Sequence, residues 1–446
     1  MRRPITMPHR APYRARAALA AGTALLAVAA CGVGADPVLH PELSEKDVTI
    51  SFAWWGAGAR TQATMEAIEL FEADHPNITV EAVYSDWNGY WDRMATATAA
   101  GDMADVVQFD QLYLSSYAER GALLDLSTVD NILDPSDLPD AVLDSGRVGD
   151  TLYAVPTGAT TNGVAVNTTL FERYGVDLPD TDTWTWEDLE EASVALGQAS
   201  GGEVSGVSPF GVDAFTLTVW ARQHGAQLFD SDGQLALPTD VLAGYWQRVL
   251  DLIDSGAAPG VARISEKIGL PLDQTSLVTG ETAMAFIPAG QFSSYRAAAP
   301  DFDFTLVNWP ADAQTPEGFQ YLKPSMYWAG ASTSSHPAEA ALLIDFLTND
   351  VRVAELFGLD RGEPGNPAFR EAVQPTLDAG GQEALAFTEA MSGEVGDTPP
   401  ITPNGASDIE VILTRYYQQV IFGETSPEEA AESFLGELGD SIRAAG

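Results

Sequence analysis

The spacing of apolar residues over the first part of the chain predicts alternating strands and helices. Residues 48–53 and 78–82 alternate between apolar and polar side chains, which indicates two strands. Residues 61–74 between them carry apolar side chains at helical spacing. A further helix precedes a buried strand over 105–109, and another helix follows it as far as Arg120. This order is typical of a mostly parallel sheet with helices on both faces.

A second series of elements begins after Pro156. The apolar pattern predicts strands over 164–166, 283–287 and 304–307 and helices over 186–196 and 241–254. Thr185 followed by Asp188 has the form of a helix N-cap, so we assign the neighbouring Trp184 and Trp186 to packing. The chain beyond a stretch rich in Gly and Pro at 362–367 is predicted to be helical.

The start of the chain is typical of an export signal. Five Arg and no acid lie within residues 1–16, and an apolar run over 17–30 is too short for an ordinary membrane span. We therefore predict a signal peptide over 1–30 and a tether over 31–47. The small residues before Cys31 resemble a bacterial lipobox, which implies cleavage before Cys31 and lipid on that residue. The alternative is a plain secretion signal with an incidental Cys.

Composition narrows the classes of partner. The chain has 22 Lys and Arg against 64 Asp and Glu, a net charge of −42. A field of that sign repels phosphate backbones and anionic lipid surfaces, so we expect no nucleic acid as a partner. Cys31 is the single Cys, which excludes an internal disulfide.

Few patterns of catalytic residues are present. The sequence contains no Gly-x-Ser-x-Gly motif, no Walker loop and no dinucleotide signature. The His residues are scattered without metal-ligand spacing, so we expect no metal and no cofactor. With 64 carboxylates, a pair of acids for glycoside hydrolysis stays open as an alternative. We nevertheless expect a protein that is not an enzyme.

Aromatic and acidic residues follow the first three predicted strands. Trp54 and Trp55 come after the first strand, Trp87 after the second, and Asp110 ends the third. The carboxyl ends of parallel strands face the ligand crevice in doubly wound sheets. Flat aromatic rings can stack on a sugar ring while a carboxylate accepts hydrogen bonds from its hydroxyls. For any single Trp the alternative is that it fills the core, but together these residues favour a ligand cleft.

Several short motifs carry a family resemblance. They include Phe52-x-Trp54-Trp55-Gly56, Ala104-Asp105-Val106-Val107-Gln108-Phe109-Asp110, Tyr153-Ala154-Val155-Pro156 and Gly280-Glu281-x-Ala283-Met284. In this order, over nearly all of the chain beyond the signal, they resemble the carbohydrate-binding group of bacterial extracellular solute-binding proteins, which are similar to maltose-binding protein.

The resemblance implies an α/β protein with the two-lobe periplasmic-binding-protein type II fold. Each lobe would be a mostly parallel sheet flanked by helices, with the ligand cleft between the lobes. The first lobe would cover 48–156 plus about 329–370 and the second 163–322 plus about 371–446, with hinges near 157–162 and 323–328. The implied function is that of a monomeric solute receptor of an ABC importer, which delivers carbohydrate to permease subunits. It would be anchored through lipid on Cys31 to the outer face of the cytoplasmic membrane.

The resemblance also implies a set of ligand-binding residues. They are Trp54, Trp55, Trp87, Asp110, Thr160, Asn162, Phe215, Gln291, Trp309 and Trp328. Many relatives have a Trp shortly after the Gly-x-x-Ala-Met strand, where this chain has Gln291 and Phe292, so either residue can replace that contact. A polyol is an alternative ligand. A phosphorylated one is disfavoured, because Arg60 and Arg361 are the only appealing cations and Arg361 fits a loop anchor better.

Overall fold

The computed structural model describes residues 40–56, 58–391 and 393–445. The predicted signal peptide, Cys31 and the first part of the predicted tether lie outside the described residues. Within the described ranges, no helix has both the length and the apolar character that a membrane crossing requires.

Twelve strands in the described chain form a six-stranded, a four-stranded and a two-stranded sheet. The six-stranded sheet has the order β12-β6-β11-β3-β1-β2 and the four-stranded sheet the order β10-β7-β9-β8. The strands are β1 (Val48–Trp55), β2 (Ile78–Ser85), β3 (Val106–Phe109), β4 (Arg147–Val148), β5 (Thr151–Leu152), β6 (Ala154–Thr160), β7 (Asn162–Asn167), β8 (Ser205–Val207), β9 (Thr282–Pro288), β10 (Phe304–Val307), β11 (Lys323–Gly330) and β12 (Glu363–Pro364).

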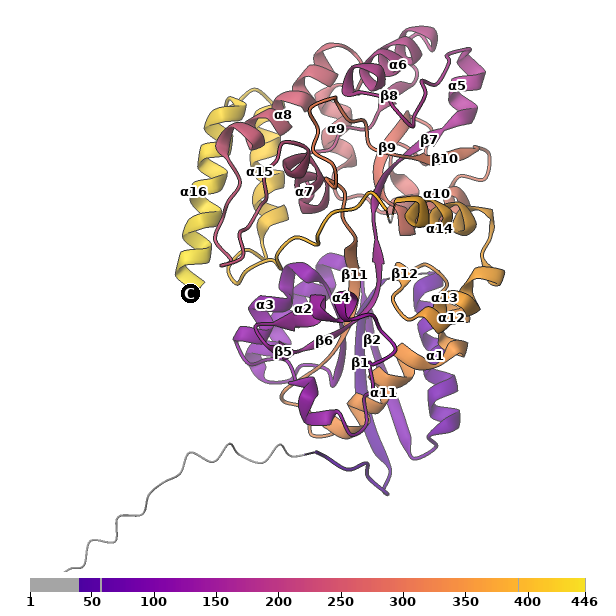
Figure 1. Ribbon diagram of the computed structural model, residues 1–446, viewed down its shortest axis with the longest axis vertical. Helices are drawn as coiled ribbons and strands as arrows, with labels where there is room; N and C mark the ends of the chain where they lie inside the picture. The colour runs from indigo at the N-terminus through magenta and orange to yellow at the C-terminus, as the bar shows by residue number, and fades with distance from the viewer. Residues whose placement is uncertain (1–39, 57, 392, 446) are drawn as a thin grey trace, which may run out of the picture. The chain divides into compact units, whose positions relative to one another are not determined.

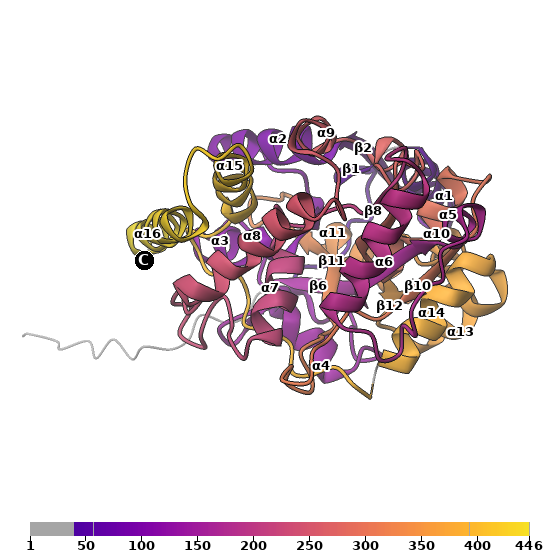
Figure 2. The same ribbon diagram turned by 90° about the horizontal axis from the view of Figure 1, so that it is seen from above.

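Helices cover both larger sheets (Figure 1). They are α1 (Ala59–Asp74), α2 (Trp87–Ala100), α3 (Gln111–Glu119), α4 (Asp140–Leu143), α5 (Thr168–Tyr174), α6 (Trp186–Ala199), α7 (Ala214–Gln223), α8 (Thr239–Asp254), α9 (Val261–Lys267), α10 (Phe292–Ala298), α11 (Pro337–Asn349), α12 (Val351–Phe357), α13 (Pro367–Val373), α14 (Ala379–Met391), α15 (Ile409–Ile421) and α16 (Pro427–Ala445). In both views α15 and α16 lie on one side and α13 and α14 on the other (Figures 1 and 2).

The two-lobe α/β architecture is confirmed, but the prediction that each sheet is mostly parallel is wrong. In the larger sheet β1 runs parallel to β2 and β3, whereas β11 is antiparallel to both β3 and β6. In the smaller sheet β7 is antiparallel to β9 and β10, and only β8 and β9 are parallel. The reason is that β6 leaves the first lobe while β11 returns to it, so these neighbours must run in opposite directions.

The chain crosses between the lobes three times. The first crossing is the single residue Thr161, which separates β6 from β7. The second occupies 308–322, and the third lies between α13, which packs on α12, and α14, which packs on α10. The segment 323–328, predicted as a hinge, instead forms most of β11 within the larger sheet. It pairs with β6 and β3 and is therefore a part of the first lobe.

Successive side chains of β1 point to opposite faces of the sheet, as strand geometry requires. Trp54 belongs to one buried cluster with Ile50 and Phe52, whereas Trp55 belongs to another with Tyr90 and Trp91. This alternation decides which of the two neighbouring Trp can reach the edge of the sheet.

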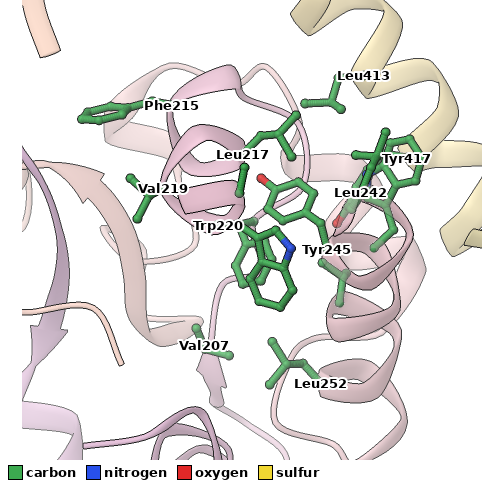
Figure 3. Packing of buried hydrophobic residues seen from close by; sticks show 14 of the residues in the cluster. Val207, Phe215, Leu217, Val219, Trp220, Leu242, Tyr245, Leu252, Leu413 and Tyr417 are labelled. Carbon is green, nitrogen blue, oxygen red and sulfur yellow. The ribbon is translucent and has the colours of Figure 1, made fainter. Parts of the chain in front are cut away.

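The core of the second lobe is built around α7 and α8. The buried side chains of α8 recur at helical spacing, and Tyr245 and Trp246 among them are fully buried. Figure 3 shows α7 side chains such as Leu217 and Trp220 packed beside Tyr245. Trp184 and Trp186 are also buried here, which confirms their assignment to packing.

Candidate ligand-binding cleft

A cavity of about 380 Å³ lies between the lobes and is lined from both sides. First-lobe strands β1, β2 and β3 run in the same direction and end at this edge of the sheet. The residues lining the cavity are Trp55, Arg60, Trp87, Asp110, Thr160, Asn162, Asp213, Phe215, Thr216, Phe286, Pro288, Gly290, Gln291, Lys323, Ser325, Met326, Asp360, Gly362 and Glu410. A larger hollow of about 670 Å³ lies around Trp184 and Trp309 and is lined by residues 182–184, 308–309, 311–312, 315–320, 391 and 393–395. Only the smaller cavity combines strand ends from one lobe with helix starts from the other, and we take it as the candidate site.

The first-lobe wall is aromatic. Trp55 ends β1, and Trp87 is the first residue of α2, directly after its N-cap Asp86. The two indole rings meet edge to face, with centroids 5.0 Å apart, and Trp91 supports both at 5.6–5.9 Å. Trp87 is half-buried and Trp55 is 8% exposed. This arrangement leaves ring surface facing the cavity on a rigid support.

Asp110 joins the wall to the start of α3. Its Oδ1 accepts a hydrogen bond from the backbone N–H of Leu112 at 2.9 Å, so it is the N-cap of the helix. Its Oδ2 lies 3.6 Å from Nζ of Lys323, which begins β11. The position of Asp110 after β3 and its bond to the start of α3 together hold its carboxylate at the cavity, with Oδ2 directed toward Lys323.

The second-lobe wall begins with Asp213, the N-cap of α7. Its Oδ1 accepts from the backbone N–H of Thr216 at 2.7 Å, and its Oδ2 accepts from the Thr216 hydroxyl at 2.6 Å. Burial raises the pKa of Asp213 above its ordinary value, against these stabilising bonds. Phe215 lies at the edge of the α7 cluster with its ring directed away from Leu217 and Tyr245 (Figure 3).

Glu410, in the first turn of α15, brings a third carboxylate to the cavity. Its Oε1 accepts a hydrogen bond from the backbone N–H of Ala214 at 3.2 Å. Burial, followed by the nearby charge of Asp213, raises the pKa of Glu410 to about 7. The charge of Asp110 raises this pKa further, and Lys323 acts in the opposite direction.

The crossing strands contribute Thr160 and Asn162. The Thr160 hydroxyl accepts from the backbone N–H of Gly290 at 3.1 Å and donates to the carbonyl of Thr161 at 3.2 Å. Asn162 is 1% exposed, and its Oδ1 accepts from the indole N–H of Trp309 at 2.9 Å. Its backbone carbonyl accepts from Gln320 at 2.9 Å. Among the described residues nothing bonds the Asn162 amide N–H₂, which is therefore a free donor in the cavity wall.

The structure brings seven of the ten predicted ligand-binding residues together. Trp55, Trp87, Asp110, Thr160, Asn162, Phe215 and Gln291 line the cavity.

The other three predicted residues, Trp54, Trp309 and Trp328, are buried and do not line the cavity. Trp54 points to the opposite face of the sheet from Trp55, and Trp328 packs edge-on against Phe52 at 5.5 Å. Trp309 lies behind the cavity wall, where its indole N–H donates to Oδ1 of Asn162 and its ring centroid lies 4.5 Å from that of Phe286.

Sequence reasoning missed most of the charged residues of the cavity. It predicted Asp110, and it considered Arg60 only as a cation for a phosphorylated ligand. Arg60 and Asp360 form a pair at 2.6 Å, and Lys323, Asp213 and Glu410 also face the cavity. Asp213 carried a usable signal, because it follows the last strand before α7. Glu410 carried none, since it comes from a helix that only the tertiary structure brings to the cleft.

Arg361 is a loop anchor, as the sequence indicated. It is 3% exposed, its Nη2 donates to the Thr64 hydroxyl at 2.7 Å, and its guanidinium lies 4.0 Å from the ring centroid of Phe357. It does not line the cavity.

Comparison with known proteins identifies the family. A profile of the bacterial extracellular solute-binding protein family matches residues 57–351, more than half of the chain. The chain belongs to this family. The matched region contains Trp87, Asp110 and most of the second lobe, but not Trp55, Asp360 or Glu410.

Relatives in sequence and in structure agree with this assignment. A lipoprotein from Streptomyces antibioticus is 26% identical over 95% of this chain and 92% of its own length. An ABC transporter extracellular-binding protein from Pyrococcus horikoshii is 24% identical over 70% and 72%.

Two solved structures share the fold of this family member. They are a periplasmic oligogalacturonide-binding protein from Yersinia enterocolitica (TM-score 0.78, 20% identity, 89% of this chain and 99% of that one) and an ABC substrate-binding protein from Listeria monocytogenes in complex with cycloalternan (TM-score 0.76, 22% identity, 89% and 99%).

Proposed function

We propose that this family member is the solute receptor of an ABC importer and that its ligand is a carbohydrate. The observation that supports this proposal is the cleft, in which a wall of indole rings on one lobe faces carboxylates and a phenyl ring on the other. Aromatic faces match the apolar faces of sugar rings, and carboxylate and amide groups match their hydroxyls. A ligand that contacts both lobes favours their closed arrangement, and the permease would recognise that arrangement.

The names of relatives support the same class of solute. One solved structure is an oligogalacturonide-binding protein and another contains cycloalternan. A mannitol-binding protein from Pseudomonas aeruginosa is 26% identical over 41% of this chain. A polyol is therefore the alternative ligand, and it belongs in the same binding experiment.

A thermal-shift screen tests the proposal. The purified protein is heated with a panel of mono- and oligosaccharides and polyols. A true ligand at about 100 times its Kd adds about 2.7 kcal/mol to the free energy of unfolding, which is readily detected. If a saturating panel of saccharides leaves the melting temperature unchanged, the carbohydrate proposal fails. A shift with polyols alone would assign the cleft to that class.

Incubation of the protein with a bound saccharide tests the rival hydrolase function. Asp110, Asp213 and Glu410 give a hydrolase its required acids, but the first two are engaged as helix caps. We expect no shorter products. Products that co-purify with the protein and disappear in Glu410→Gln would establish hydrolysis instead.

Lipid anchoring through Cys31 is the second part of the proposal. It rests on the sequence before Cys31, and the related lipoprotein of Streptomyces antibioticus supports it. Cell fractionation of Cys31→Ser tests it. We expect the variant to leave the membrane fraction, and continued membrane attachment would contradict the anchor.

A further inference from the structure

The charged groups of the cleft do not balance. Four carboxylates line the cavity, those of Asp110, Asp213, Asp360 and Glu410, against the cations Arg60 and Lys323. Arg60 is paired with Asp360, because its Nε donates to Oδ2 at 2.6 Å and its Nη2 to Oδ1 at 3.1 Å. One lysine then remains for three carboxylates.

Hydrogen bonds satisfy two of these three carboxylates but not the third. Both oxygens of Asp213 accept bonds from Thr216, and Asp110 is bonded to the N–H of Leu112 and paired with Lys323. Glu410 accepts one bond, through Oε1, from Ala214. Its Oε2 has no hydrogen-bond or ion-pair partner among the described residues, so an acceptor in the cleft wall is unused.

The unbalanced charges face one another across the cleft. Asp110 belongs to the first lobe, whereas Asp213 and Glu410 belong to the second. The starts of α3, α7 and α15 offset part of the negative charge, because helix N-termini stabilise nearby carboxylates. Burial is the first cause of the raised pKa of Glu410, and the charges of Asp213 and Asp110 raise this pKa further. Bringing the lobes together without a cation between them therefore works against like-charge repulsion.

A second, independent feature of the cavity wall also points to a ligand here. Asn162 is 1% exposed, yet its amide N–H₂ has no partner among the described residues. The bond from Trp309 to Oδ1 fixes the orientation of the amide, so the N–H₂ faces the cavity. This donor is open to the cavity and is available to an acceptor that a ligand supplies. The ligand thus offers an acceptor to Asn162 and a donor to Glu410.

From this pattern, and resting on the proposed carbohydrate receptor function, we propose that the cleft selects a saccharide that carries a protonated amine. The ammonium group binds Oε2 of Glu410 and neutralises the excess charge between Asp110 and Asp213. The hydroxyls of the same sugar satisfy Asn162. Acidic sugars are disfavoured, because Arg60 already pairs with Asp360, Lys323 pairs with Asp110, and Asp213 and Glu410 add further negative charge to the cavity wall.

Calorimetric titration at pH 7 and low salt tests this selectivity. The panel contains short oligomers of glucose and galactose type, each in four forms that differ at one substituent: hydroxyl, free amine, N-acetylated amine and carboxylate. We expect the amine form to bind at least about tenfold more tightly than the hydroxyl and N-acetylated forms, as a charge-assisted bond allows. The acid form is expected to give no measurable binding.

Two substitutions at the start of α15 distinguish recognition of the ligand's charge from general effects on ligand binding. Glu410→Gln keeps the size of the side chain and should reduce the preference for the amine to within about threefold of the hydroxyl form. Asp408→Asn removes an exposed charge two residues away and should keep the preference. Added salt should weaken binding of the amine form much more than binding of the hydroxyl form.

The outcomes distinguish this inference from the proposed function. If the hydroxyl or acid form binds as tightly as the amine form, the inference is wrong and the carbohydrate receptor stands. If the preference survives Glu410→Gln, the assigned carboxylate is wrong and so is the inference. If no form of any oligomer binds, both the inference and the carbohydrate function fail.

Discussion

Asp110 performs two tasks at the scale of single residues. One oxygen caps α3, and the other pairs with Lys323 at the cavity. Asp213 and Glu410 likewise combine a bond to the start of a helix with a place in the cleft wall. In the acidic residues, helix capping therefore coincides with the proposed contact to ligand. In the aromatic wall, the two roles belong to different residues. Trp91 supports the wall and Trp87 presents its face to the cavity.

Trp87→Ala tests this division of roles. We expect binding of the saccharide with the largest thermal shift to weaken about tenfold or more, because a stacking surface is lost. The loss of edge contacts with Trp55 and Trp91 should lower stability by only about 1 kcal/mol. Titration of the folded variant and unliganded melting curves measure the two effects. Trp91→Ala is the matched control for packing, and it should lower the free energy of unfolding by about 3–5 kcal/mol. Unchanged affinity in Trp87→Ala would remove that ring from the site.

The raised pKa of Glu410 predicts that the free energy of unfolding depends on pH. Its pKa is raised from 4.5 to about 7, so the folded state binds more protons than the unfolded state between these values. The contribution of this group to stability is therefore greatest at low pH and is lost as the pH rises from about 4.5 to about 7. The shift corresponds to at most about 3 kcal/mol, and solvent in the cleft reduces it.

Melting curves between pH 5 and pH 8 check this dependence. We expect Glu410→Gln to be more stable than the wild type by about 1–2 kcal/mol at pH 8, with the difference shrinking toward pH 5. Asp408→Asn, an exposed neighbour, should show no such pH-dependent difference. A gain of equal size at every pH would mean that Glu410 is not the titrating group.

At the scale of elements, the edge of the six-stranded sheet depends on close backbone approach. β12 pairs with β6 through Glu363 and Pro364, beside the loop that Arg361 anchors. A Cβ added at Gly158 in β6 would lie 2.2 Å from the carbonyl oxygen of Glu363. Only glycine allows this approach, which holds the segment lining the cavity at Asp360 and Gly362.

Gly158→Ala should therefore displace β12 and destabilise the protein by about 1–3 kcal/mol. Ligand affinity should fall as well, since Asp360 and its partner Arg60 line the cavity. Gly260→Ala is the matched control, because a Cβ there meets no atom within 4 Å. Chemical denaturation compares the two variants. Equal stability of both would show that β12 tolerates the added methyl group.

At the scale of the whole described chain, the two lobes are in contact in this conformation. The hydroxyls of Ser116 in α3 and Ser407 before α15 lie 2.7 Å apart, and Leu112 packs into the buried cluster of the second lobe. The pairing of β11 with β6 shifts register near Pro324 and Met326, next to the first crossing. Because the strand pairing is irregular at this point, the lobes can move relative to each other at a small cost in free energy.

Ligand binding should shift the population toward the conformation with the lobes in contact. Small-angle scattering should then show a smaller radius of gyration with a saturating saccharide than without it. The Trp87→Ala variant at the same saccharide concentration serves as the control and should change less. An identical radius with and without ligand, at proven saturation, would show that the free protein already has its lobes in contact.

The sequence by itself determined the order of strands and helices and the positions where Trp55, Trp87 and Asp110 meet the cleft. These features follow from apolar periodicity and from the rule that parallel strands end at one edge, both of which are local. The motif order also identified the family, which the profile match confirms.

Only the tertiary structure decided the direction of the crossing strands and the full composition of the cleft. Trp54 and Trp55 are alike in sequence, and the face of the sheet that each occupies depends on which side meets a core. Lys323 and Glu410 reach the cavity from segments more than 200 residues beyond Asp110, through the return of the chain across the lobes. No local pattern encodes such encounters, because they depend on packing between distant elements.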